Sequence, residues 1–130
     1  MAVLDFLSAD DVLFIHAKQI SLYDGDPGLR DRGLLESAVS QPSAGFGGTY
    51  LHDDIYLMAA AYLYHLVQNH PFVDGNKRAG AASALAFLEL NDIAIDNRVG
   101  ELYELTLATA QGQRTKEQIA VFFRERAIEA

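Results

Sequence analysis

The sequence predicts an all-α fold, a single bundle of about six helices with a small flap or hairpin loop. Glycine and proline fall mostly between apolar segments, and their clusters divide the chain into lengths typical of helices. Two of these segments, residues 53–69 and 76–90, are apolar nearly all round, which is typical of helices buried in the middle of a bundle. Because 130 residues is the length of one domain, we expect a single domain over residues 1–130.

The first two helices are predicted from their start and stop signals. Ser8 is a favourable N-cap, Asp10 and Asp11 follow in the first turn, and the helix should end at Asp24, before a glycine. A shorter second helix is expected over residues 31–40. Both should turn apolar residues toward the core.

The two apolar segments form the predicted centre of the bundle. Residues 53–69 are rich in leucine, alanine and tyrosine, and residues 76–90 are rich in alanine and include Gly80. Small side chains allow two helix axes to approach closely. We therefore expect these two helices to pack directly against each other.

The C-terminal third is predicted to hold a short extended stretch and two more helices. Ile93 and Ile95 mark the extended stretch, and a helix follows over residues 97–111. A capping-box pattern beginning at Thr115 starts the last helix, which is expected to run through Ala127.

Composition excludes several classes of function. The chain has 10 Lys and Arg against 18 Asp and Glu, a net charge of −8, which argues against direct nucleic-acid binding. The absence of cysteine excludes disulfides, thiolate nucleophiles and Cys-ligated zinc. No apolar run approaches the roughly 20 residues that span a bilayer, and the N-terminus lacks a basic signal region. We expect a cytoplasmic protein with no membrane partner.

An irregular stretch over residues 41–52 is long for a connection between helices. It places three glycines, Gly45, Gly47 and Gly48, around Phe46. The stretch is either an ordinary connection or a functional flap, since long loops in compact domains are often functional.

A polar loop lies between the two most apolar helices, with the sequence His-Pro-Phe-Val-Asp-Gly-Asn-Lys-Arg from His70 to Arg78. Pro71 prevents the preceding helix from simply continuing, and Gly75 permits a positive φ. The next helix begins at about Asn76, so its free N–H groups and positive dipole end lie beside the loop. This arrangement predicts an anion-binding site.

The side chains of the loop suit phosphate chemistry. Lys77 and Arg78 add positive charge to the anion site, and Asp74 offers the oxygen ligand that Mg²⁺ prefers when it is shared with substrate phosphates. His70 is a base able to accept a proton near neutral pH. Phe72 is the predicted apolar anchor of the loop. The alternatives are a structural helix–helix turn and a metal-hydrolase site, although no third metal ligand is evident.

The other histidines are interpreted as structural. His16 and His65 occupy inward-facing positions of predicted helices and are expected to be hydrogen-bonded packing residues. His52 stands beside a predicted helix start and is expected at the surface.

The loop from His70 to Arg78 resembles the signature of the Fic/Doc family, whose usual form is His-Pro-Phe-x-Asp/Glu-Gly-Asn-Gly-Arg. The similarity extends to the Doc (death on curing) toxin branch over nearly the whole chain. Further similar segments are Ile15-His16, Tyr23 to Gly25, Pro27 to Asp31, Leu35 to Ala38, and Phe87 to Asn91. The resemblance implies the helical Fic fold.

Two departures from the wider family agree with the Doc branch. Lys77 replaces the second glycine of the signature, and Ala81 replaces an arginine that binds the terminal phosphate in nucleotidyl-transferring members. A lysine fills space that glycine leaves for phosphates and adds charge there, so the nucleotide pose should change. The resemblance therefore implies transfer of the terminal phosphate of ATP to a Ser or Thr hydroxyl of a protein. The implied target is translation elongation factor Tu.

The resemblance also implies roles for individual residues. His70 would be the catalytic base and Asp74 would hold Mg²⁺, while phosphate would be bound by Gly75, Asn76, Lys77 and Arg78. The family uses a flap to hold the target segment, and the predicted flap here carries Phe46, Gly47 and Gly48. Two alternatives remain open, namely nucleotidyl (AMP) transfer to a protein hydroxyl and a catalytically inactive binding module.

Regulation is also implied by the resemblance. Many Fic proteins carry a self-inhibiting helix with the pattern Ser/Thr-x-x-x-Glu-Gly/Asn, and this pattern does not occur in the sequence. A separate antitoxin of the Phd kind is therefore expected as a partner, bound through a helical segment.

Overall fold

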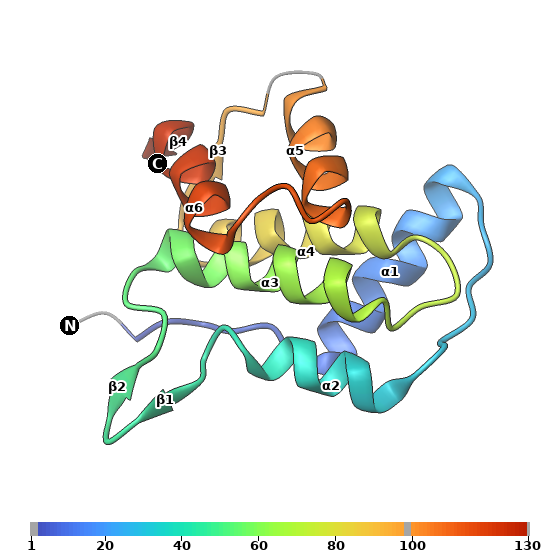
Figure 1. The fold of residues 1–130 in the computed structure, drawn as a ribbon, viewed down its shortest axis with the longest axis horizontal. Coiled ribbons are helices and arrows are strands. Elements are labelled where there is room, and N and C mark those ends of the chain that lie inside the picture. The colour runs from blue at the N-terminus through green and yellow to red at the C-terminus, as the bar shows by residue number, and fades with distance from the viewer. Residues whose placement is uncertain (1–2, 98–99, 130) are drawn as a thin grey trace.

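Six helices and two short pairs of antiparallel strands make up the computed structural model, which describes residues 3–97 and 100–129 (Figure 1). The prediction of an all-α fold with a small hairpin is confirmed. The helices are α1 (Ala9–Tyr23), α2 (Arg32–Ser40), α3 (Ile55–Asn69), α4 (Asn76–Leu90), α5 (Glu101–Ala110) and α6 (Lys116–Glu125). The strands are β1 (Gly45–Phe46), β2 (Thr49–Tyr50), β3 (Ile93–Ile95) and β4 (Ala127–Glu129).

Capping boxes start α1 and α6, as the sequence predicts. The Ser8 hydroxyl accepts a hydrogen bond from the Asp11 N–H at 3.1 Å, and the Asp11 carboxylate accepts one from the Ser8 N–H at 2.8 Å. Thr115 and Gln118 make the same exchange at the start of α6. These bonds satisfy N–H groups that have no partner inside the helix.

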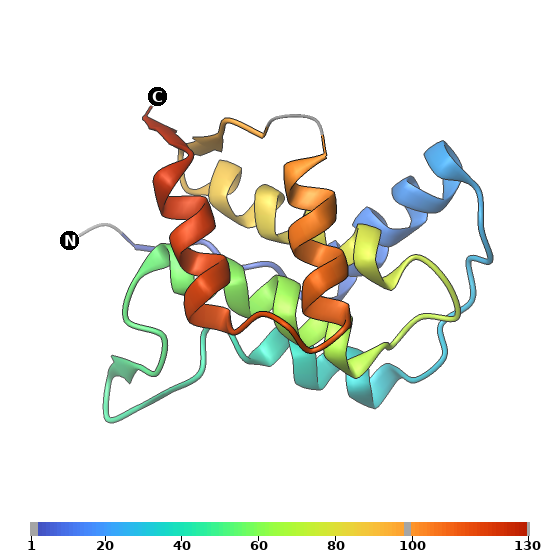
Figure 2. The same cartoon turned by 45° about the horizontal axis from the view of Figure 1, so that its top comes forward.

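Helix α3 is the centre of the bundle, and it contacts α2, α4, α5 and α6. Figure 2 shows α5 and α6 lying across the layer formed by α3 and α4. The buried side chains of α3 point in nearly all directions around its axis. They are Met58, Ala59, Ala60, Ala61, Tyr62, Leu63, Leu66 and Val67.

The predicted close contact between α3 and α4 occurs at Gly80. A Cβ atom added there would lie 3.0 Å from Val67 Cγ2 and 3.2 Å from the Leu63 carbonyl oxygen. The two helices therefore approach each other through a position that holds no side chain. This packing fixes the ends of α3 and α4 that the polar loop connects.

The C-terminal end differs from the prediction. Helix α6 ends at Glu125 rather than continuing through Ala127, which instead belongs to β4 and pairs with Ile95 of β3. Arg126 explains the change, because its carbonyl accepts a hydrogen bond from the Asp96 N–H at 2.8 Å and its guanidinium binds the Glu101 carboxylate at 2.8 Å.

Two helix starts also differ slightly from the prediction. Helix α5 begins at Glu101 after Gly100, whose φ is 91°, rather than at about residue 97. Residues 98–99 of the predicted helix lie outside the described residues. Helix α3 begins at Ile55, and its N-cap is Asp54, whose carboxylate accepts a hydrogen bond from the Leu57 N–H at 2.8 Å.

The expectation that His52 lies at the surface is wrong, since only 3% of the residue is exposed. The Lys116 ammonium lies 3.1 Å from Nε2 of His52 and 3.1 Å from Nε2 of His65. Burial, followed by the charge of Lys116, lowers the pKa of His65 to about 4, and the same two causes lower the pKa of His52. Both imidazoles thus accept hydrogen bonds from Lys116, His65 linking the start of α6 to α3 and His52 linking it to the segment before α3.

The predicted flap within residues 41–52 forms a β-hairpin, in which Gly45 pairs with Tyr50 and Phe46 with Thr49. Gly47 and Gly48 have φ values of 59° and 81°, the positive values that a two-residue hairpin turn requires. The hairpin precedes α3, whereas the polar loop follows it, and Figure 1 shows the two at opposite ends of this helix.

Among the described residues, no helix combines the length and the apolar character needed to cross a bilayer.

Replacing Gly80 by valine should destabilise the protein by about 2 kcal/mol, because the added methyl groups must push α4 away from α3. The free energy of unfolding from urea titration measures the effect. The control is Ala17→Val at an exposed position of α1, where we expect a loss of about 0.5 kcal/mol from helix propensity alone. Equal losses at the two positions would contradict the close approach.

Stability should decrease as the pH is lowered from about 6.5 toward 4. The pKa of His65 is lower in the folded chain than in the unfolded chain, so the unfolded state binds the extra proton across this interval. Urea titrations at several pH values measure the slope. In His65→Gln the amide oxygen can still accept from Lys116 but does not titrate, so the slope should be smaller; an unchanged slope would exclude His65 as its source.

Candidate active site

The loop between α3 and α4 begins with a residue in an unusual conformation. His70 is the C-cap of α3 and has φ 52° and ψ 55°, in the left-handed region. For a residue other than glycine this conformation costs about 1–2 kcal/mol, so neighbouring groups must hold it in place. The imidazole of His70 is exposed at the surface of the loop.

Arg30 holds the end of α3 in this shape. Its guanidinium donates from Nε to the His70 carbonyl at 2.7 Å and from Nη2 to the Asn69 carbonyl at 3.0 Å. Carbonyl groups at a helix C-terminus lack partners inside the helix and carry partial negative charge. One arginine therefore satisfies two such groups and fixes the backbone from which His70 projects.

The segment of residues 24–31, which joins α1 to α2, runs along the loop. The Pro71 carbonyl accepts hydrogen bonds from the N–H groups of Arg30 and Asp31 at 2.8 and 3.0 Å. The Val73 N–H donates to the Gly28 carbonyl at 2.9 Å, and Leu29 and Phe72 form an antiparallel bridge. The loop is thereby held from outside by main-chain bonds.

Asn76 closes the loop from inside. Its side chain is only 5% exposed; the amide oxygen accepts from the Phe72 N–H and the amide nitrogen donates to the Phe72 carbonyl, both at 2.9 Å. Phe72 is buried in the core, as expected for the anchor. The Asn76 side chain is thus buried and bonded to Phe72, and the backbone N–H of Asn76 is a free donor of the first turn of α4 for the phosphate binding predicted for this residue.

Asp74 lies on the exposed side of the loop. One carboxylate oxygen accepts from the Gly75 N–H at 2.8 Å, and the other accepts from the Asp26 N–H at 3.3 Å. These bonds orient the carboxylate and leave lone pairs free. Such an oxygen donor fits a Mg²⁺ ion that takes its other ligands from water and phosphate. Within residues 3–97 and 100–129, no three His, Asp or Glu side chains gather as metal ligands.

The N-terminus of α4 presents free N–H groups beside Asp74. Gly75, with φ 80°, is the N-cap, and no side chain caps the helix. The N–H groups of the first turn therefore lack intrahelical acceptors and carry partial positive charge. Together with the neighbouring cations, they form an anion site.

The two cations differ in their freedom. Lys77 is exposed, whereas Arg78 is half-buried and donates from Nη1 to the carbonyls of Asp24 at 3.0 Å and Gln19 at 3.4 Å. Its guanidinium carbon also lies 6.0 Å from the centre of the Tyr23 ring. In the part of the chain that the structure describes, neither cation forms an ion pair with a carboxylate, so both charges remain available to an anion.

The segment 24–31 approaches these groups closely at Gly25. This residue has φ 133°, and a Cβ atom added to it would lie 2.6 Å from the Asp74 carboxylate and 3.1 Å from Nη2 of Arg78. A side chain at this position would displace the metal-ligand candidate and the arginine together. Glycine is therefore required where the segment passes the loop.

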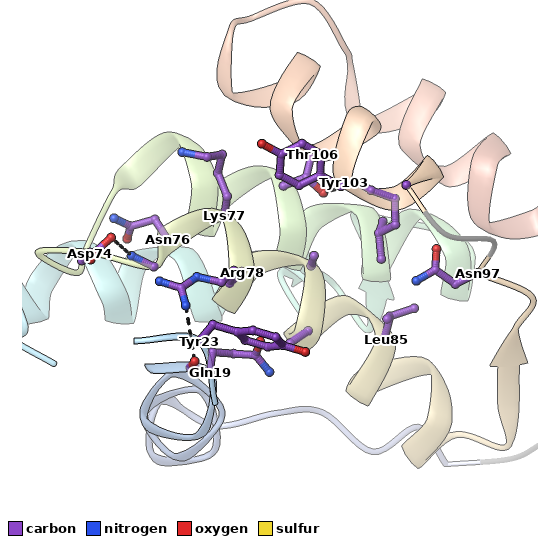
Figure 3. Close-up of a pocket in the computed structure, with 15 residues that line it drawn as sticks. Gln19, Tyr23, Asp74, Asn76, Lys77, Arg78, Leu85, Asn97, Tyr103 and Thr106 are labelled. Carbon is purple, nitrogen blue, oxygen red and sulfur yellow. Dashed lines mark hydrogen bonds between the residues drawn. The ribbon is translucent and has the colours of Figure 1, made fainter. Parts of the chain in front are cut away.

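A cavity of about 610 Å³ opens beside the anion site, between α1, α4 and α5 (Figure 3). Gln19 and Tyr23 of α1 lie on one side, and Tyr103 and Thr106 of α5 lie on the other. The loop and the start of α4 contribute Asp74, Gly75, Asn76, Lys77, Arg78, Ala81, Ala82 and Leu85 to its lining. The volume lies within the range of small-molecule binding sites.

Comparison with known proteins identifies the family. The sequence model described as the Fic/DOC family matches residues 6–88, which span α1 through most of α4 and include the whole loop. The chain belongs to the Fic/DOC family. It is similar to "Toxin Doc" of Mycolicibacterium smegmatis, with 38% identity over 91 residues that cover 70% of this chain and 68% of that protein. It is also similar to "Protein kinase doc" of Escherichia phage P1, with 31% identity over 114 residues, 88% of this chain and 89% of that protein.

The structure of this Fic/DOC protein brings some predicted site residues together and separates others. The loop between α3 and α4 contains His70 and Asp74, and α4 begins where this loop ends, as the sequence indicates. Phe46, Gly47 and Gly48 lie beyond the other end of α3, whose 15 residues span about 22 Å. Phe46 is 93% exposed, so it has no packing role in the fold, and its predicted contact with a target stays a prediction.

Sequence reasoning missed the residues that support the loop of this Fic/DOC protein from other elements. Arg30 was not singled out as a site residue. His16 was expected to be a hydrogen-bonded packing residue, but its partner, the Asp74 carbonyl oxygen 2.8 Å from its Nε2, was not predicted. The polar segment 24–31 between two helices could have indicated a supporting role, because it is longer and contains more glycine than a simple turn needs.

Asn76→Ala should reduce the free energy of unfolding by about 2 kcal/mol, because the buried Phe72 N–H and carbonyl would lose their partners. Exchange of the Phe72 amide proton with solvent should become at least about tenfold faster, which amide exchange by NMR measures directly. The control is Asn91→Ala at the other end of α4, which removes an amide with three hydrogen bonds, two to the Asp5 backbone and one to the Phe87 carbonyl. An unchanged Phe72 exchange rate in Asn76→Ala would show that Asn76 does not close the loop.

Proposed function

We propose that this protein is a Doc-like toxin of a toxin–antitoxin pair and a protein kinase that transfers the terminal phosphate of ATP to a Ser or Thr hydroxyl. One observation carries the proposal, namely that exposed Asp74 and the uncapped N-terminus of α4 line a cavity, while exposed His70 lies at the start of the same loop. The printed names of the two relatives, a toxin and a protein kinase, support it. The proposed target is translation elongation factor Tu, whose modification would block translation.

The proposed reaction assigns His70 the role of general base. His70 would accept the proton of the target hydroxyl while the hydroxyl oxygen bonds to the terminal phosphorus of ATP. The bond from this phosphorus to the bridging oxygen breaks, and ADP leaves. Catalysis of this kind depends on positioning and on charge stabilisation, which the rigid loop is suited to supply.

Asp74 would hold the Mg²⁺ ion that accompanies the nucleotide, and this ion would neutralise charge on the phosphates. The free N–H groups of Asn76 and Lys77, together with the cations Lys77 and Arg78, would bind the phosphate oxygens. The Gly75 N–H, which donates to the Asp74 carboxylate, would join them by exchanging that acceptor for phosphate. Because the carboxylate and the cations sit on fixed backbone, little reorganisation is needed when the nucleotide binds.

The cavity is the proposed place for the nucleoside. Its lining at Ala81 and Ala82 is small, which leaves room beside the helix, and the rings of Tyr23 and Tyr103 provide apolar surface. A nucleotide with its phosphates at the start of α4 would extend along α4 into this space. The anion site and the cavity are continuous, since Asp74, Lys77 and Arg78 line both.

The proposed partner is an antitoxin of the Phd kind that binds through a helical segment. The net charge of −8 favours a segment with basic residues.

Purified protein incubated with elongation factor Tu, Mg²⁺ and ATP should transfer label from the γ-phosphate and not from the α-phosphate. His70→Asn should reduce the transfer at least about 100-fold, because asparagine tolerates the left-handed conformation but does not act as a base. His65→Gln, a histidine replaced outside the loop, should retain activity. Phosphoprotein gels and mass spectrometry of the target measure the outcome.

Label that enters the target only from the α-phosphate would replace the kinase proposal with nucleotidyl transfer. Growth inhibition that persists in His70→Asn would indicate a binding module without catalysis. Unfolding curves of both variants establish that a lost activity does not reflect a lost fold.

A further inference from the structure

His16 makes a contact with the active-site loop that packing alone does not require. The residue lies on α1 and is 2% exposed, and its ring stacks on Phe72 with 3.7 Å between ring centres and an interplanar angle of 3°. Its Nε2 lies 2.8 Å from the main-chain carbonyl oxygen of Asp74. Because a carbonyl oxygen only accepts, Nε2 carries the proton and donates this bond.

The bond fixes the direction of one peptide group in the loop. The carbonyl and the N–H of a trans peptide point in opposite directions. When the Asp74 carbonyl faces His16, the Gly75 N–H faces away from α1, and it donates at 2.8 Å to the exposed Asp74 carboxylate. The Gly75 N–H therefore points to the side of the loop where the anion site lies.

Gly75 makes this direction vulnerable. Its φ of 80° is a conformation that glycine enters and leaves at little cost, so the peptide between Asp74 and Gly75 can rotate more easily than its neighbours. In the rotated state a carbonyl oxygen would face the anion site and repel phosphate. A Cβ atom added to Gly75 would lie 3.5 Å from the imidazole of His16, so the ring lies close against this part of the loop.

We propose that His16 is a positioning residue that holds the Asp74–Gly75 peptide so that the Gly75 N–H faces the anion site, where the phosphate of the nucleotide would replace the Asp74 carboxylate as its acceptor. This inference rests on the proposed ATP-dependent function and adds to it a residue of α1, more than 50 positions away in the sequence. His16 itself touches no reacting group. It acts through the orientation of Gly75.

Substitutions at His16 separate donation from packing. His16→Gln places a side-chain N–H near the position of Nε2 and keeps the donor. His16→Phe keeps a flat ring for stacking on Phe72 but has no donor, and His16→Met is a flexible donor-free substitute in case the phenyl ring is not accommodated. Tyr62→Phe is the control, because it removes a buried hydrogen bond to Leu7 away from the loop.

Two readouts test the proposal in the full chain. The first is the Gly75 amide resonance in ¹⁵N–¹H spectra without nucleotide, and the second is the dissociation constant of Mg²⁺–ATP. In His16→Phe and His16→Met we expect the Gly75 resonance to shift and ATP affinity to fall about tenfold, the effect of losing one hydrogen bond to a charged ligand. His16→Gln should stay within about threefold of the original affinity, and Tyr62→Phe should change stability without changing either readout.

Donor-free variants that keep both the Gly75 resonance and the ATP affinity would overturn the proposal and leave the kinase proposal intact. Equal losses in His16→Gln and His16→Phe would also overturn it, because the loss would then follow packing rather than donation. Failure of the unsubstituted protein to bind ATP would contradict the proposed function, whereas the Gly75 resonance would still report on His16.

Discussion

The polar loop between α3 and α4 needs hydrogen-bond partners for its backbone, and the rest of the site depends on which groups supply them. The carbonyls of Asn69 and His70 are bound by Arg30, and that of Pro71 by two main-chain N–H groups. From inside, Asn76 binds both backbone groups of Phe72. Unpaired groups here would cost free energy and allow other conformations. Satisfying them leaves a single loop shape.

Rigidity of the helices is what makes this loop shape useful. Helices α3 and α4 meet at Gly80, α3 is buried on most sides and α4 along one face, so the two ends of the loop cannot move independently. His70, Asp74 and the first turn of α4 are therefore displayed from fixed points. A site that depends on charge and orientation requires such support more than it requires many functional side chains.

Much of the fold was accessible from the sequence because it is encoded locally. Caps at Ser8 and Thr115 and the all-round apolar character of α3 and α4 depend on residues a few positions apart. Pairing of β4 with β3 and the burial of His52 depend on distant partners, Arg126 with Asp96 and Lys116 with two histidines. Local pattern carries no information about such partners.

The same limit applies to the candidate site. The loop itself was recognisable, since proline, glycine and the charged residues stand together in nine positions. Its supports, Arg30 and His16, lie about 40 and 58 positions from their acceptors, and only the three-dimensional structure brings them together.

The close passage of Gly25 beside Asp74 and Arg78 has a consequence for how this chain tolerates change in length. Connections between helices usually accept inserted or deleted residues, because they lie at the surface with few contacts. The α1–α2 connection is bonded to the loop residue by residue, so a shift of one position would move a side chain onto the Asp74 carboxylate. The glycine turn of the β1–β2 hairpin, with open space around Gly47 and Gly48, has no such restriction. This chain is therefore expected to accept a change of length at the hairpin and not at the connection.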